Sequence, residues 1–79
     1  MSKIPPHSGK EMIAALLRAG FTEDRTSGDH VVLAKPGLAR PVIVPLYNEL
    51  PDFIVSNNLR TAGISRKEYL VLMGKRRRA

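Results

Sequence analysis

The sequence feature that most restricts the possible folds is a pair of identical helix-start signals, one on each side of a valine-rich middle segment. Ser8 and Glu11 stand three residues apart, and so do Ser65 and Glu68. This is the spacing of a capping box, in which the serine and glutamate side chains each accept a hydrogen bond from a backbone N–H at the start of a helix. The sequence therefore predicts one helix near its start, another near its end, and extended structure between them.

The first helix is predicted from an apolar stripe that ends at a glycine. Gly20 can adopt the left-handed conformation that commonly terminates a helix. Before it, four apolar residues recur at the spacing of one helical face, and we expect all of them in the core: Met12, Ile13, Leu16 and Leu17.

The middle segment divides into three predicted strands, Phe21 to Arg25, His30 to Lys35 and Pro41 to Leu46. Turn signals separate them at Ser27-Gly28-Asp29 and at Pro36-Gly37. The connections are too short for crossover helices, so the strands should form an antiparallel meander.

A helical pattern returns at Pro51-Asp52 and should end at Gly63. A short third helix is expected over Arg66 to Met73, with a stop at Gly74. The buried side of the longer helix should be formed by four apolar residues: Phe53, Ile54, Val55 and Leu59. The fold class is therefore α+β, with helices on one face of the sheet.

The opposite sheet face should stay open and still carry apolar side chains. Alternate residues of a strand face opposite ways, so Val31 and Leu33 lie on one face and Val32 and Ala34 on the other. An open apolar face indicates a protein partner, and self-association into a homo-oligomer is the alternative.

Net charge is +6, from 13 basic and 7 acidic residues. Four of the basic residues form the run Lys75 to Arg78, which leaves 9 against 7 in the rest of the chain. We expect residues 1–74 to form one domain and residues 75–79 a basic tail. Such a tail either aids solubility or holds phosphate backbones.

Several kinds of chemistry are excluded by what the chain lacks. It has no cysteine, which rules out disulfides, thiolate metal sites and a thiol nucleophile. The two histidines are far apart in sequence, so we expect no metal and no cofactor. The start of the chain lacks the apolar stretch of a secretory signal, and no run of about 20 apolar residues could cross a membrane. We expect a cytoplasmic protein.

RNA cleavage is a reaction that one titratable residue in a basic setting can support. RNA carries its own nucleophile, the 2′-hydroxyl, so the protein needs only a base and cations. His30 follows the glycine turn at the start of a strand, where a rigid backbone holds its side chain open to solvent. The alternative is an ordinary surface histidine. His7, in a proline-rich lead-in, is interpreted as structural or exposed.

A series of short landmarks runs in order from Ser8 to about Leu72. They are Ser8-Gly9-Lys10-Glu11, Ala19-Gly20-Phe21, Gly28-Asp29-His30, Pro41-Val42-Ile43-Val44-Pro45, Leu59-Arg60 and Ala62-Gly63-Ile64-Ser65. In order and spacing this series resembles the HicA family of toxin–antitoxin systems.

The resemblance implies a double-stranded-RNA-binding-domain-like α-β-β-β-α fold. It also implies an RNA-binding domain that cleaves mRNA without metal and is inhibited by a HicB antitoxin. His30 corresponds to the catalytic histidine of the family and Lys10 to its usual helix-one lysine. Three further basic residues are candidate RNA contacts or simply solvated charges: Arg25, Lys35 and Arg40.

The chain departs from the family pattern at three places. Asp29 replaces a serine, and its carboxylate either repels RNA phosphate or pairs with His30. Leu46-Tyr47-Asn48 replaces a more basic stretch, and Asn58 an aliphatic residue. Tyr47 could stack on a base, whereas Phe21 fits the core better. The leading hypothesis is an endoribonuclease toxin, and the alternatives are a non-catalytic RNA-binding module and a protein-interaction domain.

Overall fold

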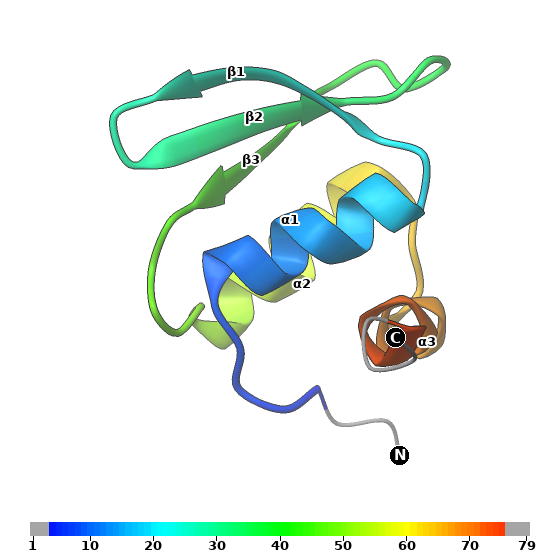
Figure 1. The fold of residues 1–79 in the computed structure, drawn as a ribbon. Helices are drawn as coiled ribbons and strands as arrows, with labels where there is room; N and C mark the ends of the chain where they lie inside the picture. Colours follow the sequence, from blue (N-terminus) through cyan, green and yellow to red (C-terminus); the bar gives the residue numbers. More distant parts are fainter. Residues whose placement is uncertain (1–3, 76–79) are drawn as a thin grey trace.

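The computed structural model describes residues 4–75 of the chain. One helix is followed by three strands and two further helices, so the predicted α+β order is confirmed (Figure 1). The strands pair antiparallel in the order β1-β2-β3, which is the predicted meander. The elements are α1 (Gly9–Arg18), β1 (Thr22–Ser27), β2 (His30–Ala34), β3 (Val42–Pro45), α2 (Asp52–Ala62) and α3 (Arg66–Lys75).

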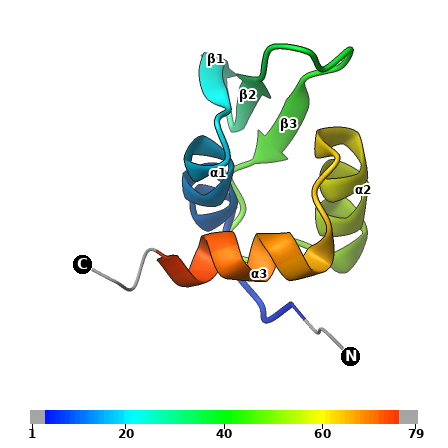
Figure 2. The same cartoon turned by 90° about the vertical axis from the view of Figure 1, so that its right-hand side faces the viewer.

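The helices lie on one side of the sheet. Figure 2 shows α1 and α2 side by side beneath the sheet, with α3 running crosswise on their far side. Val31 and Leu33 of β2 face these helices, as do their partners Val44 and Val42 of β3, and all four are buried. Within residues 4–75, no helix covers the opposite sheet face. The core therefore lies between the sheet and the helices, and it continues to α3, where Tyr69 is fully buried.

Both predicted capping boxes are formed. The Glu11 N–H donates to the Ser8 hydroxyl at 3.2 Å, and the Ser8 N–H donates to the Glu11 carboxylate at 2.8 Å. At α3, the Glu68 N–H donates to the Ser65 hydroxyl and the Ser65 N–H donates to the Glu68 carboxylate, each at 3.1 Å. These bonds satisfy N–H groups that have no partner inside the helix.

Two of the residues expected in the core are exposed instead. Leu17 is 45% exposed and Phe53 is 65% exposed. Because each helical residue is turned by about 100° from the one before it, a buried stripe is narrow. The stripe of α2 follows Val55 and Leu59, which leaves Phe53 on the far side of the helix.

The predicted helix stop at Gly74 is wrong, because α3 continues to Lys75. A glycine ends a helix by taking a positive φ. Gly20 (φ 99°) and Gly63 (φ 72°) do so, but Gly74 does not. The expected basic tail at residues 75–79 begins inside the backbone of α3, and residues 76–79 lie outside the described part of the chain.

The strand ends differ from the prediction by one or two residues. β1 begins after Phe21 and extends to Ser27, with a bulge between Glu23 and Arg25. Phe21 is only 2% exposed, because it turns into the core at the end of α1. β2 stops before Lys35, and β3 is the shorter span Val42–Pro45.

Candidate functional site

His30 lies at the first position of β2, on the uncovered face of the sheet. Its backbone is paired on both sides, with Ser27 of β1 and with Pro45 of β3. Val31, the next residue, faces the core, so alternation directs His30 away from it. The His30 side chain is 49% exposed. A histidine in this position is held by two neighbouring strands and remains accessible to a large ligand.

The turn before His30 brings a carboxylate within hydrogen-bonding distance of the imidazole ring. Ser27 and His30 are paired, so the loop between them has two residues, Gly28 and Asp29. Gly28 has φ 58°, and a glycine with positive φ at the first position is typical of a type II′ hairpin turn. The Asp29 carboxylate lies 3.0 Å from Nδ1 of His30. From the sequence, Asp29 was expected either to repel RNA phosphate or to pair with His30, and the structure contains the Asp29–His30 pair.

This contact determines how the imidazole can act. A carboxylate oxygen accepts hydrogen bonds, so the proton between the two groups belongs to Nδ1 of His30. In the neutral ring Nε2 is then the unprotonated nitrogen and can accept a proton. Asp29 is 74% exposed, so its charge also faces any anion that approaches the ring.

The start of α1 is locked against the end of β3, beside His30. The Gly9 N–H donates to the Tyr47 carbonyl at 2.9 Å. A Cβ on Gly9 would overlap the carbonyl oxygen of Pro45, so only glycine allows this approach. Figure 1 shows the starts of α1 and β2 and the end of β3 at the same end of the molecule. Lys10, exposed in the first turn of α1, is thereby placed at the His30 end.

Arg25 also lies on the His30 side of the sheet. It is paired with Val32, which shares a face with His30 because the two are separated by one residue. This puts Arg25 one diagonal position from His30, a spacing that long side chains can bridge. Of the predicted RNA contacts, Arg25 is thus diagonal to His30 on the same sheet face, and Lys10 lies at the same end of the molecule on α1 (Figure 1).

Lys35 and Arg40 lie at the other end of the sheet. Lys35 follows the last residue of β2, and its Nζ lies 5.5 Å from the centre of the Phe21 ring. Arg40 is exposed in the connection between β2 and β3. The fold therefore does not gather all four basic residues into one cluster around His30.

Tyr47 joins the site although its role was undecided from the sequence. The Leu46 N–H donates to the Asp29 carbonyl at 2.7 Å, which extends the β2–β3 pairing beyond Pro45. Alternation along this extension puts Tyr47 on the same side as His30. Its side chain is 46% exposed. Phe21, the other aromatic considered for base stacking, is in the core.

His7 has no part in this site. It is 5% exposed, its Nδ1 donates to the Pro5 carbonyl at 2.9 Å, and its Nε2 lies 2.9 Å from the Tyr69 hydroxyl. Both ring nitrogens are thus occupied, and the structural interpretation of His7 is confirmed. Within the described residues 4–75, no group of three His, Asp or Glu side chains could hold a metal ion. In the same range no helix has the length and apolarity needed to span a membrane.

Comparison with known protein families gives a match. The model described as HicA toxin of bacterial toxin-antitoxin matches residues 9–64. The chain belongs to the HicA toxin family. The match runs from the start of α1 to the residue after Gly63, and it contains His30 together with its neighbours on β1 and β3. No curated protein matches the chain.

Membership gives this HicA chain the role of a toxin in a toxin–antitoxin system, whose partner is an antitoxin. The resemblance inferred from the landmark residues is thereby confirmed. α3 lies beyond the matched residues, so it is an addition to the part of the fold that the family model covers.

Proposed function

We propose that this HicA toxin is a metal-independent endoribonuclease that cleaves mRNA in the cytoplasm and is neutralised by a HicB-like antitoxin. The observation that carries the proposal is the 3.0 Å contact between Asp29 and Nδ1 of His30. It leaves Nε2 of an accessible histidine free to accept a proton, at the end of the molecule where Lys10 and Arg25 also lie (Figure 1).

The reaction uses the nucleophile that RNA itself carries. Nε2 of His30 takes the proton of a 2′-hydroxyl, and the freed 2′-oxygen forms a bond to the adjacent phosphorus. The bond from phosphorus to the 5′-oxygen breaks, and that oxygen leaves with a proton from solvent. Lys10 and Arg25 stabilise the negative charge that builds up on the phosphoryl oxygens. Asp29 keeps the imidazole in the tautomer that the first step needs.

The remaining candidate RNA contacts are given roles according to where they lie on the sheet relative to His30. Lys35 and Arg40, at the far end of β2, would bind phosphates that flank the cleaved linkage. Tyr47 is placed to stack on a base beside that linkage. Phosphate contacts of this kind position the strand, whereas the stacked base adds affinity with little sequence preference.

The open sheet face supports the assignment of a HicB-like antitoxin. Val32 and Ile43 are paired on that face, two residues along from the His30–Pro45 pair; Ile43 is 49% exposed, whereas Val32 is only 8% exposed. An antitoxin that covers Ile43 would also cover His30, which lies on the same face. Inhibition would then follow from exclusion of RNA, with no change in the toxin fold.

A non-catalytic RNA-binding module is the second candidate, and the exposure of Asp29 favours it. A 74% exposed carboxylate beside the histidine repels the phosphate that must approach Nε2. The two candidates share the same RNA-binding residues. They differ in whether RNA is broken, so one assay separates them.

The test measures cleavage of a single-stranded mRNA fragment by the purified protein with EDTA present. We expect cleavage by the wild type and a rate lowered by about 10²–10⁴-fold in His30→Ala, the usual contribution of a histidine base. Thr22→Ala is the matched control, because Thr22 lies on the same sheet face at the far end of β1. Full activity of His30→Ala would contradict the catalytic assignment, and binding without cleavage by the wild type would favour the second candidate.

A further inference from the structure

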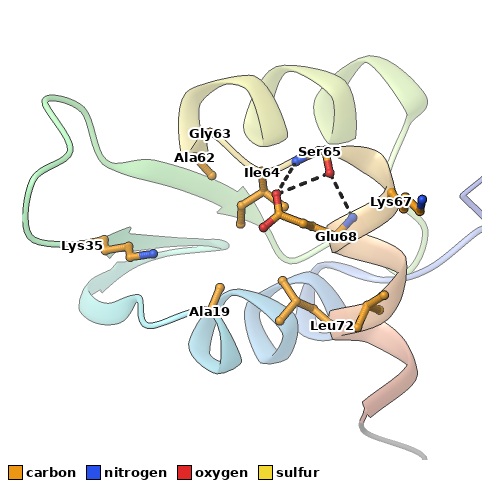
Figure 3. Close-up of a pocket in the computed structure, with 10 residues that line it drawn as sticks. Ala19, Lys35, Ala62, Gly63, Ile64, Ser65, Lys67, Glu68 and Leu72 are labelled. Atoms are coloured by element: carbon orange, nitrogen blue, oxygen red, sulfur yellow. Dashed lines mark hydrogen bonds between the residues drawn. The ribbon is translucent and has the colours of Figure 1, made fainter.

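A second candidate binding site lies at the end of the molecule away from His30. It is a groove of about 470 Å³ between the end of α1, the α2–α3 turn and one side of α3. Figure 3 shows Ala19 on one wall and Ile64 and Leu72 near it, with Lys35 reaching in from the end of β2. This volume lies within the range of ligand pockets, roughly 300–1,000 Å³.

The groove is apolar inside and positively charged at its edges. Ala62 and Val71 also line it, and the Val71 side chain is 58% exposed. Lys35 and Lys67 stand at its rim. Neither lysine forms an ion pair with another described residue of 4–75.

The one carboxylate in the groove is already engaged. Glu68 accepts hydrogen bonds from the Ser65 N–H at 3.1 Å and from the Ser65 hydroxyl at 3.4 Å, as the dashed lines of Figure 3 show. It serves as the capping-box residue of α3, where a negative charge also offsets the positive end of the helix. Glu68 keeps its negative charge, so the two lysines give the lining of the groove an excess of one positive charge.

We propose that this groove binds an acidic segment of a partner protein, with an apolar side chain seated between α1 and α3 and carboxylates paired with Lys35 and Lys67. The apolar walls favour a protein segment over RNA, whose phosphates would meet only the rim. The lysines repel both the chain's own Arg76 to Arg78 and a second copy, whose net charge is +6. This proposal goes beyond the RNase function, because the groove contains none of the residues assigned to the cleavage step, and it shares only Lys35 with the proposed flanking phosphate contacts.

The binding test uses the ¹⁵N-labelled full chain and three acetylated peptide amides, Glu-Leu-Leu-Glu, Gln-Leu-Leu-Gln and Glu-Ser-Ser-Glu. The first should shift the amide signals of Ala19, Gly63 and Leu72 in a saturable manner and leave that of His30 unchanged. The glutamine peptide should bind about fivefold more weakly, as expected for loss of a partly exposed ion pair. The serine peptide should not bind, because it has no apolar anchor.

Two variants and one competing probe complete the test. Lys67→Glu should weaken binding of the acidic peptide at least about fivefold. Arg60→Glu, which makes the same charge change on an exposed α2 residue outside the groove, should not. Equal weakening of peptide binding by both variants would show that the peptide responds only to the net charge of the protein, which would contradict a specific site. If no peptide shifts the amide signals of the groove residues, the proposed site is wrong. A ten-residue oligouridylate that shifts the groove signals more strongly than the peptide would assign the groove to RNA.

Discussion

At the scale of single residues, Asp29 has two opposing effects on the site. Its carboxylate repels phosphate, but it also holds Nδ1 of His30 at 3.0 Å. Asp29→Ser removes the charge and keeps a hydroxyl that can accept from Nδ1. We expect this variant to bind RNA about two- to fivefold more tightly, the range for one partly exposed charge, and to cleave at least as fast as the wild type.

Asp29→Ala is the matched control for this prediction, because it removes the same charge without leaving an acceptor. It should gain the same affinity but cleave more slowly, since the ring loses the group that sets its tautomer. Both variants are compared with the wild type by RNA titration and single-turnover cleavage at one salt concentration. Weaker binding or slower cleavage by Asp29→Ser would show that the carboxylate itself is required.

At the scale of secondary-structure elements, the contact between α1 and β3 places Lys10 at the same end of the molecule as His30 (Figure 1). Gly9→Ala would place a Cβ on the carbonyl oxygen of Pro45, so we expect a loss of about 1–3 kcal/mol in the free energy of unfolding. Gly74→Ala makes the same chemical change inside α3, where a Cβ would meet nothing within 4 Å. It should stabilise the protein by up to about 1 kcal/mol. The urea midpoints of the two variants should therefore shift in opposite directions from that of the wild type. An unchanged unfolding free energy for Gly9→Ala would show that α1 does not pack tightly against the end of β3.

At the scale of the whole molecule, a buried hydrogen bond ties the N-terminal segment to α3. The Tyr69 hydroxyl, fully buried, lies 2.9 Å from Nε2 of His7, which is 62 residues away in sequence. Since Nδ1 of His7 already donates to a carbonyl, the hydroxyl donates to Nε2. Burial raises the pKa of Tyr69 well above that of a free tyrosine, and the charge of Glu11 adds to this effect.

This pKa shift predicts how stability depends on pH. The unfolded chain ionises Tyr69 above about pH 10, whereas the folded chain keeps it protonated, so the stabilisation is complete below pH 10 and is lost as the pH rises further. We expect wild-type unfolding free energy to fall more steeply above pH 10 than that of Tyr69→Phe. Near pH 7 the variant should be about 1–3 kcal/mol less stable, because Nε2 of His7 loses its donor. Parallel pH profiles of the two proteins would contradict the assignment.

Local signals in the sequence were sufficient for the element order. The two capping boxes, the Gly20 and Gly63 helix ends and the Gly28 turn each act within a few residues, and all are present in the structure. Those signals do not say which side of an element meets the core. Phe53 and Leu17 were misplaced for this reason, because burial depends on the angle at which a helix packs rather than on hydrophobicity alone.

For the candidate site, the sequence by itself determined His30 and the possibility of its pairing with Asp29, since a two-residue turn joins neighbours along the chain. Only the tertiary structure decided which other residues accompany them. It placed Arg25 on the His30 face and Lys10 at the His30 end of the molecule (Figure 1), placed Lys35 and Arg40 at the far end of β2, and added Tyr47. The physical reason is that these neighbours depend on strand register and on the packing of α1 against β3, which are set by contacts between residues distant in sequence.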